Sequence, residues 1–290
     1  MDIQNNKEIM KNEIIKKIDL RILLLISLLI IFYSIIINYL IKINFFEPLI
    51  IGTYYLIQPE LISGLIWIVI FSILIFYVGK LKIKDLLLDR KRIKLGLKWT
   101  LILWIITNLF SIIYLIITKD ELKITDSINV SIGEFIGQLF GNAALEEMLF
   151  RGLFFIQFYL LFGQKVNNKF AIILAILVSQ VFWSVVHIPN RLLNRQIEHL
   201  ILELIRLFIY GVILTIIFIK TKNLILLVGA HSLLNVPFNL IEIDFPLPIV
   251  VLMLIVIISL FWNILENEEK RSFFNVGLIT EKKAQNANTR

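Results

Sequence analysis

The sequence predicts an all-α fold, a polytopic bundle of transmembrane helices. Of its 290 residues 58% are hydrophobic, and the mean hydropathy is +0.85. Charge-free runs such as Ile22–Ile41 are about twenty residues long, the length that crosses ~30 Å of hydrocarbon. Only six prolines and twelve glycines interrupt the chain. A soluble domain would need polar helix faces, and these runs do not supply them.

The apolar runs predict about eight spans, at residues 22–41, 61–79, 99–117, 132–162, 170–187, 200–219, 224–241 and 247–264. Two of them are unusual. The fourth is long and carries a charged cluster, and the seventh contains Gly229 and Pro237. Such breaks are tolerated at membrane depth only where the backbone is buried in protein or lines a wet cavity.

Lysine and arginine set the expected orientation. With the N-terminus inside, the inside segments hold 22 of these residues and the outside segments hold 5, while Arg151 and Arg206 lie within spans. Cytoplasmic loops carry the excess of basic residues, so we expect both termini to be cytoplasmic in a multi-pass protein of the cell membrane. The basic residues are spread over loops, which predicts contact with the lipid bilayer and no nucleic-acid partner.

Composition also limits the chemistry. The chain has no cysteine, which excludes disulfides, thiolate metal sites and a cysteine nucleophile. Residues 1–21 are too long and too acidic for the n-region of a signal peptide, and no A-x-A-like site follows the first apolar run, so that run is predicted to be a retained span. The basic stretch 80–98 is either a solvated loop or a helix lying along the membrane surface. The polar tail 265–290 is predicted to be disordered.

Three groups of polar residues lie within the spans, where an ionisable side chain marks a candidate functional site. In the first group, Glu147 and Arg151 are four residues apart and can pair on one helix face. Glu146 points about 100° away and keeps a free carboxylate. The alternative is a charge-balanced pair with a second acid that is simply protonated.

The other two groups repeat this spacing of four. Trp183 and His187 share a face at the end of the fifth span, and His231 and Asn235 share a face of the broken seventh span. A histidine at a span end can be merely interfacial. A His–Asn pair can merely join two helices, which is worth about 1 kcal/mol.

Together these residues suit water-dependent cleavage of an amide bond. The Glu146 carboxylate can take a proton from water, and His187 can hold that water or pass the proton on. His231 and Asn235 can donate hydrogen bonds to a developing oxyanion. Alternatively Glu146, His187 and His231 bind Zn²⁺ and leave one position open for water. No H-E-x-x-H zinc motif, G-x-S-G serine motif or pair of aspartates in the spans indicates another type of intramembrane protease.

The order E-E-x-x-x-R, aromatic-x-x-x-H and H-x-x-x-N, each in a separate span, resembles the CAAX-processing and bacteriocin-processing family of intramembrane proteases (CPBP, also called Abi). The matching residues, within about 132–240, are Glu146, Glu147, Arg151, His187, His231 and Asn235. One difference is that Trp183 stands where the family usually has Phe. The resemblance divides the chain into an N-terminal region with three spans (1–131), a protease core (132–241), a last span (242–264) and the tail (265–290).

The resemblance implies an endopeptidase whose polar cavity opens toward the cytoplasm, although the predicted spans place His187 near the outer face. It assigns water activation to Glu146, assistance to His187, oxyanion binding to His231 and Asn235, and orientation of the site to Glu147 and Arg151. The family is commonly described as metalloproteases, and a metal-free glutamate mechanism is equally compatible with these residues. For a bacterial chain the implied substrate is a small peptide precursor or a membrane protein, in bacteriocin maturation or immunity. The sequence indicates no oligomeric state.

Two other functions fit a membrane bundle. A non-catalytic immunity or regulatory scaffold protein of the same fold would tolerate Glu146→Gln. A proton-coupled transporter could use Glu146 and the histidines as a relay, but the sequence shows no internal repeat of the kind that transporters use.

Overall fold

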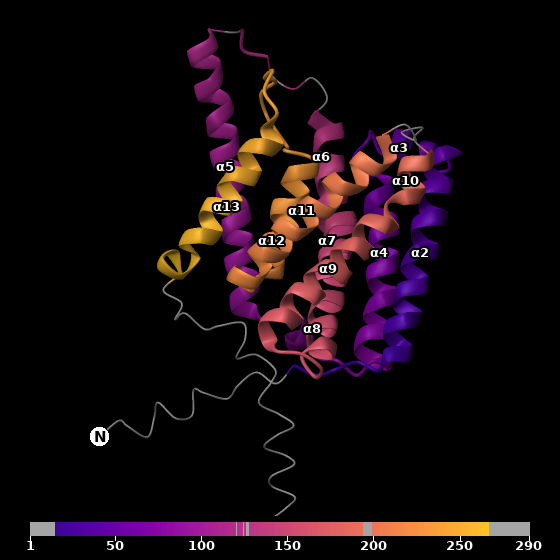
Figure 1. The fold of residues 1–290 in the computed structure, drawn as a ribbon. Helices are drawn as coiled ribbons and strands as arrows, with labels where there is room; N and C mark the ends of the chain where they lie inside the picture. Colours follow the sequence, from indigo (N-terminus) through magenta and orange to yellow (C-terminus); the bar gives the residue numbers. More distant parts are fainter. Residues whose placement is uncertain (1–14, 120, 124, 126–127, 194–198, 267–290) are drawn as a thin grey trace, which may run out of the picture.

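The chain folds into a bundle of packed helices (Figure 1). A computed structural model describes residues 15–119, 121–123, 125, 128–193 and 199–266. The helical elements in these residues are α2 (Leu20–Lys42), α3 (Glu47–Gly52), α4 (Pro59–Ser72), η1 (Ile73–Val78), η2 (Ile83–Leu86), α5 (Arg90–Thr118), α6 (Ile128–Gly137), η3 (Gln138–Asn142), α7 (Ala143–Glu147), η4 (Met148–Phe155), α8 (Ile156–Phe162), α9 (Asn168–Val186), α10 (Ile188–Leu193), α11 (Leu200–Thr221), α12 (Leu224–Asn235) and α13 (Leu247–Leu265). No β-strand occurs in this part of the chain, so the predicted all-α class is confirmed. The predicted disordered tail lies outside the described residues.

Six helices of the described chain are long and apolar enough to cross a membrane. They are Leu20–Lys42, Pro59–Val78, Ile83–Thr118, Asn168–Leu193, Leu200–Thr221 and Leu247–Leu265. Large hydrophobic side chains on these helices point outward and are exposed, for example Leu28, Ile116 and Ile201. Such an apolar exterior fits lipid as the surrounding solvent. The count of eight spans stays a prediction, because the predicted spans 132–162 and 224–241 are not among these six helices.

The predicted span 132–162 is a continuous helical run from Ile128 to Phe162 that changes type along its length. Two π-helical segments, η3 and η4, flank the five-residue α7, which carries Glu146 and Glu147. Short π segments inside α-helices occur frequently at functional sites. The wider turns therefore surround the charged cluster that the sequence singled out.

The predicted span 224–241 is shorter than expected. α12 ends at Asn235, and Val236 is extended with φ −136° and ψ 98°. Pro237 follows, and a proline disfavours the helical conformation of the residue before it. His231 and Asn235 consequently lie in the last two turns of a twelve-residue helix.

α5 is longer than predicted at its start. The side chain of Asp89 accepts a hydrogen bond from the backbone N–H of Arg92 at 3.0 Å, which caps a helix that begins at Arg90. The second half of the basic stretch 80–98 is therefore the first part of α5 and not a loop.

The start of α2 and the end of α13 lie on one face of the bundle, at the lower side of Figure 1. Lys16 donates to the backbone carbonyl of Lys80, just after η1. Lys98, near the start of α5, pairs with Glu266, just after α13, at 3.1 Å. Asn223, before α12, donates to the carbonyl of Arg92. We call this the terminal face, and the opposite side, which includes α3 and α10, the distal face.

Two clusters of buried apolar residues hold the bundle together. One is built mainly on α5, α8, α9, α11, α12 and α13. The other joins α2, η1, η2 and η4 and includes Trp183 of α9. The candidate site lies between the two clusters, since its walls include Leu145 and Phe150 of the second cluster and Leu214 of the first.

Gly141 of η3 allows the closest approach of the fourth span to α4. A Cβ atom on Gly141 would overlap the backbone carbonyl of Glu60, and Gly64 meets Gly141 in the same way. Small residues permit such contacts between membrane helices. We expect Gly141→Ala to lower the free energy of unfolding by about 1–3 kcal/mol through overpacking, measured as thermal stability in detergent. Gly52→Ala, with no atom within 4 Å of the added Cβ, is the control, and equal stability of the two variants would contradict this packing.

Candidate active site

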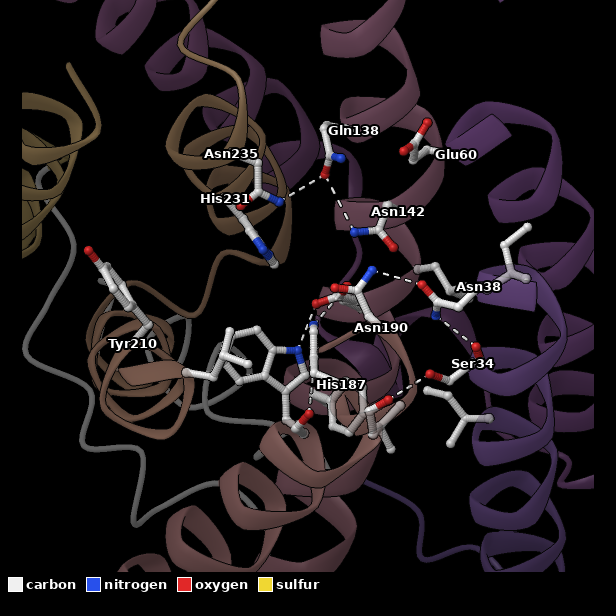
Figure 2. A pocket seen from close by; sticks show the side chains of 18 of the residues that line it. Ser34, Asn38, Glu60, Gln138, Asn142, His187, Asn190, Tyr210, His231 and Asn235 are labelled. Carbon is white, nitrogen blue, oxygen red and sulfur yellow. Dashed lines mark hydrogen bonds and ion pairs between the residues drawn. The ribbon is translucent and has the colours of Figure 1, made fainter. Parts of the chain in front are cut away.

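A cavity of about 570 Å³ lies between the two apolar clusters. Four of the predicted site residues line it, namely Glu146, His187, His231 and Asn235. Glu146 comes from α7, His187 directly follows α9, and His231 and Asn235 come from α12. Figure 2 shows His187, His231 and Asn235 around the pocket. Glu147 and Arg151 are not among the lining residues and are fully buried behind it.

The Glu146 carboxylate contacts two side chains from another part of the chain, Trp183 and His187. Its Oε2 accepts a hydrogen bond from the indole Nε1–H of Trp183 at 2.7 Å. Its Oε1 lies 3.6 Å from Nε2 of His187. The carboxylate is 12% exposed, so it is nearly buried but still faces the cavity. Both partners come from α9, 37 or more residues further along the chain.

The His187 ring is held by its own helix. Nδ1 lies 2.7 Å from the carbonyl oxygen of Trp183. A carbonyl oxygen only accepts hydrogen bonds, so Nδ1 carries a hydrogen. Nε2 is thereby left to face Glu146, and it can receive or return a proton there. The indole and imidazole rings are 5.0 Å apart and nearly perpendicular, which confirms the shared face predicted from the spacing.

Behind the cavity, Glu147 links α7 to α12 through a contact with His231. Its Oε1 accepts from Arg151 Nη1 at 2.9 Å, which confirms the predicted pair, and from His231 Nδ1 at 2.8 Å. Because a carboxylate accepts, Nδ1 of His231 carries the hydrogen and Nε2 is the ring atom left for the cavity. Such a carboxylate behind a histidine fixes its tautomer and orientation.

Arg151 is tied to two further elements. Its Nη2 donates to the carbonyl of Gly211 on α11 at 3.4 Å, and its guanidinium lies 4.7 Å from the Trp183 ring centre. Glu147 and Arg151 therefore connect α7, η4, α9, α11 and α12 at the back of the site. Their role in orienting the site stays a prediction.

Asn235 lies at the cavity but shares its amide with residues that the sequence analysis missed. Its Nδ2 donates to Gln138 Oε1 at 2.9 Å, and Asn142 Nδ2 lies 3.5 Å from the same oxygen. One N–H of the Asn235 amide remains for a substrate. Gln138, Asn142 and Glu146 follow each other at intervals of four in an apolar span. That polar stripe was a signal that could have revealed them.

The N-terminal region also forms part of the wall, although its sequence showed no recognisable chemistry. Ser34 of α2 donates to the carbonyl of Val186 at 2.6 Å, and Asn38 accepts from Asn190 at 2.7 Å. These contacts fasten α2 to the end of α9 and to α10 (Figure 2). Glu60 and Ser63 of α4 line the cavity as well.

Trp183 contributes more than packing. A phenylalanine, the usual residue in the resemblance, would fill the space but could not donate to Glu146. We expect Trp183→Phe to lower the cleavage rate by about 2- to 10-fold, since one hydrogen bond is lost. Trp99→Phe is the matched control, because Trp99 also donates to a carboxylate, Glu266, but on the terminal face. Equal rates for both variants, measured on one peptide substrate, would contradict a role for the indole N–H.

The predicted zinc ligands do not form a ligand group here. Among the described residues, no set of three or more His, Cys, Asp and Glu side chains is arranged to hold a metal ion. The geometry therefore gives no support to the expectation that Glu146, His187 and His231 share a metal.

Comparison with known proteins gave one finding. Residues 128–237 match the family model described as Type II CAAX prenyl endopeptidase Rce1-like. Searches of curated proteins and of solved structures gave no match. The matched segment begins at α6 and ends just after α12, so it holds all six predicted site residues. Residues 128–237 are thus similar to the Rce1-like type II CAAX prenyl endopeptidases, a similarity consistent with the CPBP family that the three motifs resemble.

Proposed function

We propose that the protein is an intramembrane endopeptidase in which Glu146 activates water for attack on a peptide bond. The observation that carries the proposal is the Glu146 carboxylate, directed into the cavity by Trp183 and beside Nε2 of His187. The Rce1-like domain and the apolar helices support an intramembrane protease family. Its substrate is a small peptide precursor or a membrane protein.

We propose the following steps for the reaction. Glu146 takes a proton from water, and the hydroxide adds to the carbonyl carbon of the substrate. The resulting oxyanion accepts hydrogen bonds from the free N–H of Asn235 and from Nε2–H of His231. His231 donates from Nε2 as an imidazolium, whose Nδ1–H stays on the Glu147 carboxylate. The C–N bond then breaks, and the proton from Glu146 passes to the leaving amine directly or through His187.

The proposal is tested by comparing peptide termini in membranes and medium from cells that express wild type or Glu146→Gln at matched levels. Termini that occur only with wild type would support a protease and identify its substrate. Identical termini, with the wild-type phenotype kept by the variant, would overturn the proposal and favour a non-catalytic immunity or regulatory scaffold.

In the proposed mechanism no step uses a metal ion, so we expect cleavage to persist after metal removal. Purified protein would be treated with a strong zinc chelator, dialysed and assayed on the identified substrate. A rate within about 2-fold of untreated protein is expected, since Glu146 and His187 supply the proton transfer. Loss of activity that added Zn²⁺ restores would contradict the metal-free mechanism.

A further inference from the structure

The walls of the cavity become more exposed in one direction along the bundle. On α2, Tyr33 is 8% exposed and Ile41, two turns later, is 39% exposed. On α12, His231 is 5% exposed and Asn235, one turn later, is exposed. All four residues line the cavity. Both helices run from the terminal face toward the distal face, so exposure rises toward the distal face.

The helices that run the other way show the reverse order along the sequence. On α11, the exposed Arg206 precedes the buried Leu214, and on α4, the half-buried Glu60 precedes the buried Ser63. The shared direction is therefore a property of the cavity and not of any one helix. Its mouth lies on the distal face.

Toward the terminal face the cavity is closed. Phe150 lies one helical turn beyond Glu146 and is 1% exposed, and Phe154 follows with no exposed surface. Both pack against Phe182, with ring centres 5.6 Å and 5.1 Å away. This aromatic floor separates Glu146 from the terminal face.

Basic residues gather on the closed side. The segments next to the terminal face include Lys16, Lys80, Arg92, Lys98 and Lys220. In the sequence, the segments expected on that side of the membrane hold 22 lysines and arginines, and the segments expected on the other side hold 5. The excess of basic residues in cytoplasmic segments predicts that the terminal face is cytoplasmic. The mouth would then face away from the cytoplasm.

We infer that the active site opens to the non-cytoplasmic side of the membrane. Resting on the proposed function, this makes the substrate a peptide segment presented on that side, either a translocated peptide or the outer end of a membrane-spanning helix. The lining suits such a segment, because Asn38 and Asn190 supply polar groups while Leu145 and Phe150 provide an apolar interior. The cytoplasmic opening implied by the family resemblance is thereby reversed.

The absence of cysteine from the chain makes the side of the opening directly measurable. Ile41→Cys would place one thiol at the mouth, and Lys165→Cys, in the exposed turn between α8 and α9, one thiol on the terminal face. Intact cells would be treated with a charged maleimide that does not cross membranes, before and after permeabilisation. Wild type measures the background.

We expect Ile41→Cys to react in intact cells, and Lys165→Cys only after permeabilisation. The opposite pattern, or reaction of Ile41→Cys only after permeabilisation, would overturn the inference. Labelling requires no catalysis, so this result is independent of whether the protein is a protease. Once a substrate is known, labelling Ile41→Cys from outside should lower cleavage at least about 10-fold by blocking the mouth, and unchanged cleavage would argue against this route of access.

Discussion

Glu146→Gln is expected to lower the cleavage rate by about 10²- to 10⁴-fold, the usual contribution of a positioned general base. The amide has the size of the carboxylate, and its oxygen can still accept from the indole N–H of Trp183, which lies 2.7 Å from Glu146 Oε2. It cannot take a proton from water. The variant should therefore remain inserted and folded while it loses catalysis. The measurement is the rate on one peptide substrate, together with the thermal stability of the purified protein in detergent.

The control for this prediction is Glu134→Gln. Glu134 is an exposed residue of α6, in the same helical run as Glu146. It does not line the cavity. Its rate should stay within about 2-fold of wild type, because no proton transfer depends on it. A Glu146→Gln enzyme that cleaves as fast as Glu134→Gln would show that Glu146 is not the base.

The local pairs of the site could be predicted from the sequence. Residues four apart on a helix are neighbours whatever the rest of the chain does, and the pairs Glu147–Arg151 and Trp183–His187 are in contact as predicted. The helical class followed in the same way from the apolar runs. These features depend on backbone periodicity alone.

The contacts between helices could not be predicted in this way. That Glu146 meets Trp183, and that His231 shares Glu147 with Arg151, depends on how the helices cross and turn. Close approaches at glycines and the π segments around α7 set those positions. The spacing of residues in a single sequence does not reveal close approaches between helices or π segments. The sequence analysis therefore found no partner for Glu146.

The ends of two helices differed from the sequence prediction for local reasons. α5 begins at Arg90 because Asp89 caps it, although the basic residues there resemble a loop in a hydropathy profile. α12 ends before Pro237 although the apolar run continues. Hydropathy records where a segment can lie in lipid, whereas capping and proline decide where the helix begins and ends.

Arg151→Met is expected to have the largest effect on stability. The variant leaves the Glu147 carboxylate buried without its cation, and removing one partner of a buried ion pair costs about 3–5 kcal/mol. It also removes the contacts to the carbonyl of Gly211 and to the Trp183 ring. We expect a strongly lowered thermal midpoint in detergent, or little inserted protein. Arg151→Lys keeps the charge but not the planar guanidinium, so it should fall between wild type and Arg151→Met.

The double variant Glu147→Gln, Arg151→Met separates the two roles of Glu147. With both charges removed, no uncompensated ion is left in the interior, so stability should recover in part relative to Arg151→Met. Cleavage should stay low, because a neutral amide no longer orients the His231 ring as the carboxylate does across the 2.8 Å contact that Glu147 makes to Nδ1. Recovery of both stability and cleavage would show that Glu147 serves only to balance Arg151. Recovery of stability alone would mean that the buried carboxylate positions His231 for catalysis as well as balancing the charge of the arginine.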